Sequence, residues 1–154
     1  MTHGIDNKNM QFIYTSKARA SAINELLEAS HKLVTKGSPV LAFDAIPLYH
    51  FMTETRPFLP NSTPMFYTNQ QFETELAKAV QKDGLPVIVQ QKIWTIHEGS
   101  GWPEDIRENN NMEETLNNKR NQAFYQFLKT NNYEVAWSND VFRILVPTDK
   151  KIIK

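Results

Sequence analysis

Hydrophobic positions along the chain change between helical spacing and short continuous runs. Over residues 16–36 they recur at helical spacing, with Ser16 as a suitable N-cap and Gly37 as a natural stop. The resulting stripe contains Ile23, Leu26, Leu27, Ser30, Leu33 and Val34. The run 39–43 that follows is almost wholly apolar, which favours a strand covered on both faces, as in a parallel sheet.

A second helix is expected directly after this run. Asp44 is placed as its N-cap, and Ala45, Leu48, Tyr49 and Met52 share one face. Residues 53–68 contain three prolines and look irregular. Thr68 and Gln71 fit a capping box for a further helix, which Gly84 ends.

Residues 86–89 repeat the pattern of a proline followed by a buried strand. A last helix is expected from Asn111, and its apolar face contains Leu116, Ala123, Phe124, Phe127 and Leu128. Residues 133–147 are expected to form two strands around a turn. This order predicts an α/β fold: a layered, Rossmann-like sandwich with a mostly parallel central sheet and a C-terminal antiparallel hairpin. We expect one domain over residues 12–148, a flexible N-terminal segment 1–11 and a tail 149–154.

The amino-acid composition limits the classes of partner that we expect for this chain. The 154 residues suit a single domain, and the 17 basic and 17 acidic side chains cancel, which argues against nucleic acid and against a polybasic membrane patch. The chain lacks cysteine, a signal peptide and any apolar run long enough to span a bilayer. Its four histidines have no metal-ligand spacing, and phosphate-binding glycine motifs are absent, so we expect no metal and no cofactor.

Candidate binding residues follow the two predicted parallel strands, because ligands of open α/β sheets bind at the carboxyl ends of the strands. Asp44 follows the first strand, and Gln91 and Lys92 follow the second. If the strands are neighbours, these three side chains could converge into a polar sugar-binding set. The alternative is that Asp44 only caps a helix and Lys92 is solvated.

Aromatic residues beside polar groups form a second set of candidates, since such faces suit carbohydrate rings or a protein partner. We include Tyr49, Arg56, Trp94 and Trp102, the last two from a long loop that could be a lid or a docking surface. In the loop around Arg56, Phe58, Phe66 and Tyr67 could instead pin the chain to the core. His97 and Glu98 are adjacent and so point apart on extended chain, and we assign no catalytic residue.

Three stretches carry a family resemblance: 14–27 (YTSKARASAINELL), 40–57 (VLAFDAIPLYHFMTETRP) and 85–92 (LPVIVQQK). Together they resemble the C-terminal soluble domain of bacterial polytopic membrane glycosyltransferases of GT-C type, similar to dolichyl-phosphate-mannose–protein mannosyltransferases. The resemblance covers roughly residues 12 to 92. It implies that membrane helices precede this domain, that a lipid-phosphate-linked sugar is the donor and that the catalytic carboxylate lies in the membrane part.

Three functions are consistent with the sequence. The resemblance implies a periplasmic accessory domain beside the inner membrane, whose partners are the membrane-embedded part of the same polypeptide and a glycan or lipid-linked sugar. The residues alone also allow a free-standing α/β enzyme or sugar-binding protein that uses Asp44, Gln91 and Lys92. A purely structural docking module is the third hypothesis.

Overall fold

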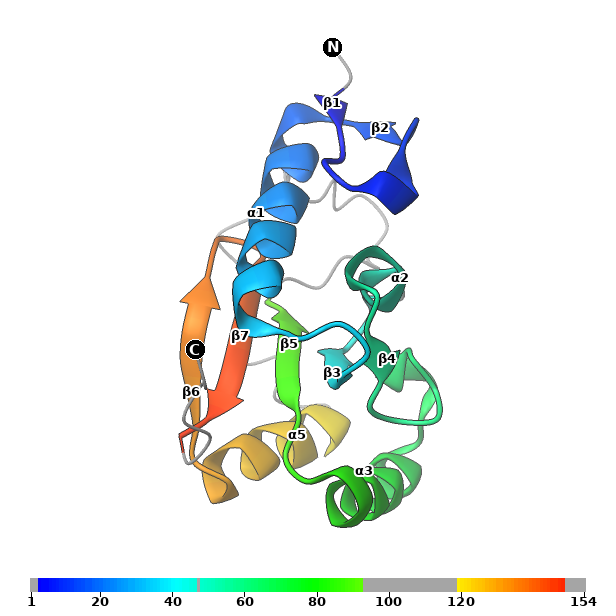
Figure 1. The fold of residues 1–154 in the computed structure, drawn as a ribbon. Helices are drawn as coiled ribbons and strands as arrows, with labels where there is room; N and C mark the ends of the chain where they lie inside the picture. Colours follow the sequence, from blue (N-terminus) through cyan, green and yellow to red (C-terminus); the bar gives the residue numbers. More distant parts are fainter. Residues whose placement is uncertain (1–2, 47, 93–118, 149–154) are drawn as a thin grey trace.

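The computed structural model describes residues 3–46, 48–92 and 119–148. Its main sheet has five strands in the order β4-β3-β5-β7-β6 (Figure 1). Their bounds are Arg56–Pro57 for β4, Pro39–Phe43 for β3, Val87–Gln91 for β5, Phe142–Pro147 for β7 and Tyr133–Ser138 for β6.

The sheet is mixed. β3 runs parallel to both β4 and β5, whereas β7 is antiparallel to β5 and to β6. The α/β content and the C-terminal hairpin agree with the prediction. The parallel part is smaller than predicted, since only two of these four pairings are parallel.

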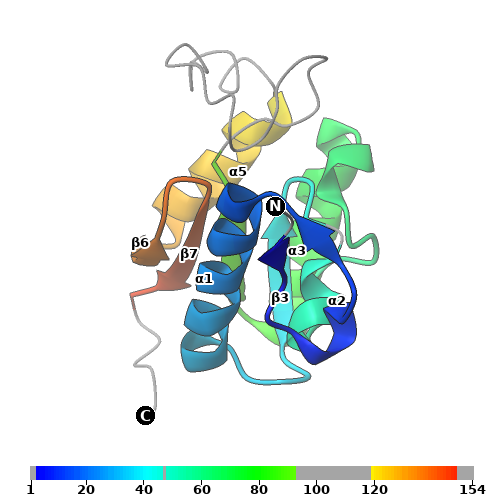
Figure 2. The same cartoon turned by 90° about the horizontal axis from the view of Figure 1, so that it is seen from above.

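Helices cover both faces of the sheet, as the view from above shows (Figure 2). Helix α1 (Lys17–Leu33) packs on one face, where Val40 and Ala42 of β3 meet Leu26. Helices α3 (Asn69–Asp83) and α5 (Lys119–Thr130) pack on the other, where Leu41 and Phe43 point. Alternate residues of one strand thus enter different cores, because side chains alternate across a strand.

The helix ends follow the chemistry of the capping residues. The Ser16 hydroxyl accepts from the backbone N–H of Arg19, so α1 begins where predicted, and it ends at Leu33. Thr68 and Gln71 form the predicted capping box at the start of α3. Gly84 ends α3 with φ of 75°, a conformation that favours glycine. The predicted start of the last helix at Asn111 lies outside the described residues.

Two elements between β3 and α3 differ from the expectation. Helix α2 (Tyr49–Thr53) has Leu48 at its N-cap, so the interpretation of Asp44 as a helix cap is wrong. The strand β4 was not predicted, because Pro57 disfavours a strand. An edge position tolerates a proline, and here the N–H groups of Arg56 and Phe58 still donate to the carbonyls of Ser38 and Val40.

Residues 3–10 pack on the domain, although we expected segment 1–11 to be flexible. Strand β1 (His3–Gly4) pairs with β2 (Tyr14–Thr15), and the 3-10 helix η1 (Lys8–Met10) lies between them. Ile5 and Met10 are buried in a small core with Ala20, Leu27 and Met52. Two isolated apolar residues in a polar stretch do not reveal such a core, because their partners come from α1 and α2.

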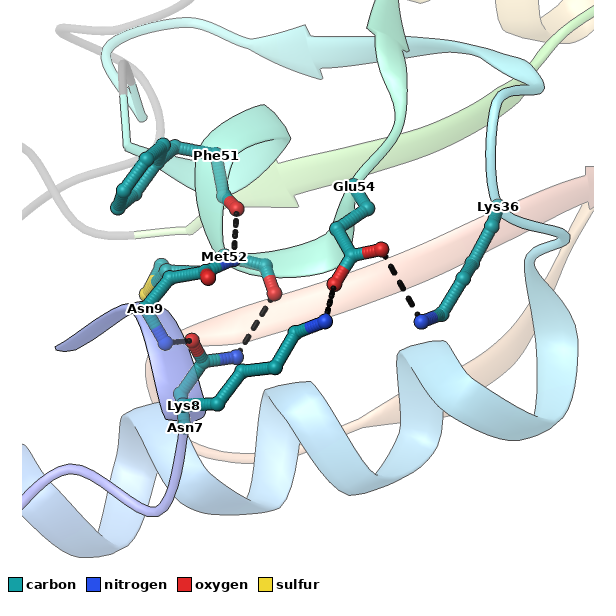
Figure 3. Close-up of polar contacts among 7 residues, drawn as sticks. All are labelled: Asn7, Lys8, Asn9, Lys36, Phe51, Met52 and Glu54. Atoms are coloured by element: carbon teal, nitrogen blue, oxygen red, sulfur yellow. Dashed lines mark hydrogen bonds and ion pairs between the residues drawn. The ribbon is translucent and has the colours of Figure 1, made fainter. Parts of the chain in front are cut away.

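Side chains of this segment also bind α2 through its carbonyls (Figure 3). Asn7 Nδ2 donates to the carbonyl of Met52 at 2.7 Å, and Asn9 Nδ2 donates to that of Phe51 at 3.0 Å. Glu54, just after α2, pairs with Lys8 at 2.5 Å and with Lys36 at 3.1 Å. The two lysines hold the pKa of Glu54 below its ordinary value through hydrogen bonds. The segment is therefore held by polar contacts as well as by burial.

Candidate functional site at the carboxyl ends of the strands

Asp44 lies at the carboxyl end of β3 and forms a buried ion pair with Arg120 of α5. Its Oδ2 accepts from Arg120 Nη2 at 2.6 Å, and the two side chains are only 11% and 10% exposed. Arg120 Nη1 also donates to the carbonyls of Met65 and Tyr67. One guanidinium therefore joins the end of β3, the 3-10 helix η2 (Pro64–Phe66) with the residue after it, and α5. Arg120 was not among the sequence candidates, because 76 residues separate it from Asp44.

Burial of Asp44 disfavours the charged form of its carboxylate. It raises the pKa of Asp44 from its ordinary value, and the charge and hydrogen bond of Arg120 act in the opposite direction. The second oxygen, Oδ1, is buried and has no hydrogen-bond partner in the part of the chain that the structure describes. A buried acceptor without a partner is unfavourable, so Asp44 retains the capacity to accept one more hydrogen bond.

A second polar chain lies on the same face of the sheet. Gln90 of β5 is buried, and its Nε2 donates to the Tyr125 hydroxyl of α5 at 3.2 Å. Arg143 of β7 donates from Nε to Gln90 Oε1 at 2.8 Å. In register, Gln90 stands between Phe43 and Arg143. We call these two hydrogen-bonded sets at the ends of the neighbouring strands β3 and β5 the polar edge: Asp44 with Arg120, and Gln90 with Tyr125 and Arg143.

Gln91 and Lys92 take a different direction. Gln91 stands beside Phe142 in register, and Phe142 points into the core under α1. Lys92 is exposed and its Nζ donates to Ser138 Oγ at 3.2 Å, at the end of β6. Since β7 and β6 lie on the side of β5 away from β3, this contact turns Lys92 away from Asp44. Asp44 therefore pairs with Arg120, whereas Lys92, which we expected beside Asp44, contacts Ser138.

Tyr49 and Arg56 lie elsewhere. Tyr49 is fully buried and donates from its hydroxyl to Ser30 Oγ at 3.0 Å, and burial raises its pKa to about 12. It is a core residue with no face for a ligand. Arg56 is half-exposed, pairs with Asp83, and stands opposite Pro39 at the start of β3, far from the carboxyl end. The candidates Trp94 and Trp102, with His97 and Glu98, lie outside the described residues.

The aromatic loop before α3 divides its side chains between the core and the surface. Phe58 is buried, and the half-buried Tyr67 accepts at its hydroxyl from the backbone N–H of Asn61. Phe66 is 72% exposed. The loop is thus pinned at Phe58 and Tyr67, as one interpretation held, while Phe66 stays open to solvent.

Acid–base and metal chemistry find little support in the described residues. His50 is buried, its Nδ1 lies 3.0 Å from Thr55 Oγ1, and burial lowers its pKa to about 4. An imidazole with that pKa is a weak base at neutral pH.

Two further features are absent from residues 3–46, 48–92 and 119–148. No three metal-ligating side chains cluster there, and no helix there is long and apolar enough to cross a membrane.

A surface groove of about 840 Å³ runs between α3 and α5. Its apolar part comes from Leu76, Val80, Ala123 and Phe127. It shares no residue with the polar edge, and none of the sequence candidates within the described residues lines it.

Comparisons of the chain with protein-family models, with curated proteins and with solved structures found no match.

Proposed function

We propose that this chain is an extracytoplasmic accessory domain of an integral-membrane glycosyltransferase that uses a lipid-phosphate-linked sugar donor. In this proposal the domain sits on the periplasmic side of the inner membrane and positions a glycan or acceptor, while the catalytic residues lie in the membrane part. The resemblance of residues 12 to 92 supports the family assignment. We also propose that the sheet with helices on both faces is a variant of the Rossmann-like sandwich.

The observation that carries the ligand-binding part is the polar edge. Two arginines, a carboxylate, an amide and a phenol gather at the carboxyl ends of β3 and β5. Ligands of open α/β sheets bind at that end, and sugar hydroxyls pair well with carboxylates, amides and guanidinium groups. Arg143 and Tyr125 are both half-buried and both bonded to Gln90, so these two side chains combine access to solvent with a fixed position. Of the two, Arg143 carries the charge that a sugar hydroxyl can pair with as an acceptor.

A titration of the amide NMR spectrum with a panel of mannose- and glucose-containing oligosaccharides tests this. We expect shifts at residues 44, 90–92 and 143, lost in Arg143→Met and kept in the matched control Arg56→Met, whose arginine lies at the other end of β3. Absence of shifts with every sugar, or equal shifts in Arg143→Met, would contradict a glycan site at the polar edge.

The reading frame upstream of Met1 tests the membrane part of the proposal. Repeated apolar segments of about 20 residues in the same frame support a tail domain of a membrane enzyme. Translation that starts at Met1 with no such segments contradicts it and favours a free-standing protein.

A further inference from the structure

We propose that the tip formed by Phe12, Ile13 and Tyr14, together with Lys17, docks on the surface of a lipid bilayer. This inference rests on the proposed placement beside a membrane, because a domain remote from any bilayer would have no use for such a tip. It concerns a surface separate from the polar edge.

The tip exposes more apolar surface than the fold requires. Phe12 is 85% exposed, Tyr14 60% and Ile13 46%, three consecutive residues between η1 and α1. Single exposed apolar residues are ordinary, whereas a run of three at one projecting point is not. Folding offers no reason to retain these side chains, since their removal would leave both main cores intact.

Phe12 also holds a backbone conformation that disfavours its side chain. Its φ is 74°, in the left-handed region where glycine and asparagine are favoured and bulky residues are uncommon. Glycine or asparagine at this position would relieve both the backbone strain and the exposed ring. The presence of phenylalanine therefore points to a use for the ring outside the folded chain.

Contacts of the residues before and after the tip fix its conformation. On its N-terminal side, Met10 is buried and the side chains of Asn7 and Asn9 bind carbonyls of α2 (Figure 3). On its C-terminal side, β2 pairs with β1 and leads to the capped start of α1. The tip is therefore presented in a fixed conformation, which reduces the entropy lost on docking.

The chemistry favours a lipid surface over a protein partner. At about 200 Å² for each fully exposed side chain, the three residues offer roughly 300–400 Å², well under the ~800 Å² per partner of a stable protein interface. Aromatic rings with flanking cations are typical of side chains that settle at the bilayer interface. Residues 3–20 carry Lys8, Lys17 and Arg19 and one carboxylate, Asp6. Lys8 is paired with Glu54, so Lys17 and Arg19 are the cations that can face a lipid surface. Of these cations, Lys17 is exposed and begins α1, close in sequence to the tip.

Cosedimentation with lipid vesicles tests the inference on the full chain. The probes are vesicles of phosphatidylcholine alone and of equal parts phosphatidylcholine and phosphatidylglycerol. We expect the wild type to partition to the mixed vesicles, and the triple variant Phe12→Ser, Ile13→Ser, Tyr14→Ser to partition roughly tenfold or more weakly, because its apolar contact is gone. Lys17→Ala should weaken partition only to the anionic vesicles.

Val135→Ser is the matched control, since Val135 is 51% exposed on β6 and remote in sequence from the tip. It should partition like the wild type, and the thermal midpoint of the triple variant should stay near that of the wild type, which shows that it folds. Failure of the wild type to bind either vesicle, or equal binding by the triple variant, overturns the inference. So does a dimer in sedimentation velocity that the triple variant abolishes without any vesicle binding.

The vesicle assay and the glycan assay test two separate surfaces, so a negative result in one does not imply a negative result in the other. A triple variant that loses vesicles but still shows sugar-induced shifts at the polar edge separates the two surfaces. Vesicle binding without any glycan binding would leave the tip assigned and contradict only the glycan site.

Discussion

At the scale of single residues, the buried ion pair between Asp44 and Arg120 makes the end of β3 sensitive to substitution. A buried pair often contributes little relative to apolar residues of the same size, but removal of one partner leaves an uncompensated charge. Asp44 already has one buried oxygen without a partner among the described residues, so it depends strongly on Arg120. The pair fixes how α5 meets the end of β3.

We predict that Arg120→Met lowers the free energy of unfolding by about 3–5 kcal/mol, because Asp44 would remain buried without its cation. Urea denaturation at pH 7 measures the change. The double variant Asp44→Leu, Arg120→Met should recover a large part of the loss, since it removes both charges. If the double variant is as unstable as the single one, the pair is not the cause of the loss.

The buried imidazole of His50 leads us to expect that the free energy of unfolding depends on pH. Its pKa is about 4 in the folded chain against an ordinary value of 6.5, because burial disfavours the charged imidazole. Between these two values the unfolded chain binds more protons, so stability is lost as pH falls from 6.5 towards 4 and returns as pH rises.

We therefore expect the free energy of unfolding, followed by urea denaturation from pH 4 to 7, to rise more steeply in the wild type than in His50→Asn. Because both proteins share the same carboxylates, the difference between their slopes isolates the imidazole. Parallel curves over that range would show that His50 does not titrate as its burial implies.

At the scale of elements, the N-terminal segment behaves as part of the fold although its strands are only two residues long. Such short strands contribute few hydrogen bonds, so the small core around Met10 and the contacts with α2 must hold the segment in place. This element also supports the docking tip.

We predict that Met10→Ala destabilises the protein by about 2–3 kcal/mol, because it opens a cavity beside Leu27 and Met52. Limited proteolysis should then cut the chain near residues 11–14 faster than in the wild type. Gln11→Ala, a change at an exposed neighbour, should alter neither quantity. Unchanged proteolysis in Met10→Ala would mean that the polar contacts alone hold the segment.

At the scale of the whole molecule, two cores share one sheet. Strands β3, β5 and β7 send alternate side chains into the core under α1 and into the core under α3 and α5. Neither core can open fully without loss of packing on these three strands. We expect the domain to unfold as one cooperative unit.

Leu26→Ala tests this coupling from one face. Leu26 is buried under α1, and its truncation should cost about 2–5 kcal/mol. Native-state hydrogen exchange should then show a similar loss of protection in α1 and in α3 and α5 on the opposite face. A loss confined to α1 would show that the two faces open separately.

The sequence determined the local features of this protein, because they depend on residues close together in the chain. Ser16, Thr68 with Gln71, and Gly84 mark helix ends by hydrogen bonds or dihedral angles that span a few positions. The buried strands follow from continuous apolar runs at 39–43 and 86–89, although the second strand extends two polar residues further, to Gln91. The C-terminal hairpin follows from two runs around a turn.

Only the tertiary structure decided which polar side chains meet. Asp44 pairs with Arg120 across 76 positions, and Gln90 joins Tyr125 and Arg143 from two other elements, whereas Lys92 turns to Ser138. Periodicity places Tyr49 on a helix face, but only packing shows that this face is wholly buried. The physical reason is that contacts between distant residues depend on strand order and on the angle of each helix, and no local pattern encodes either.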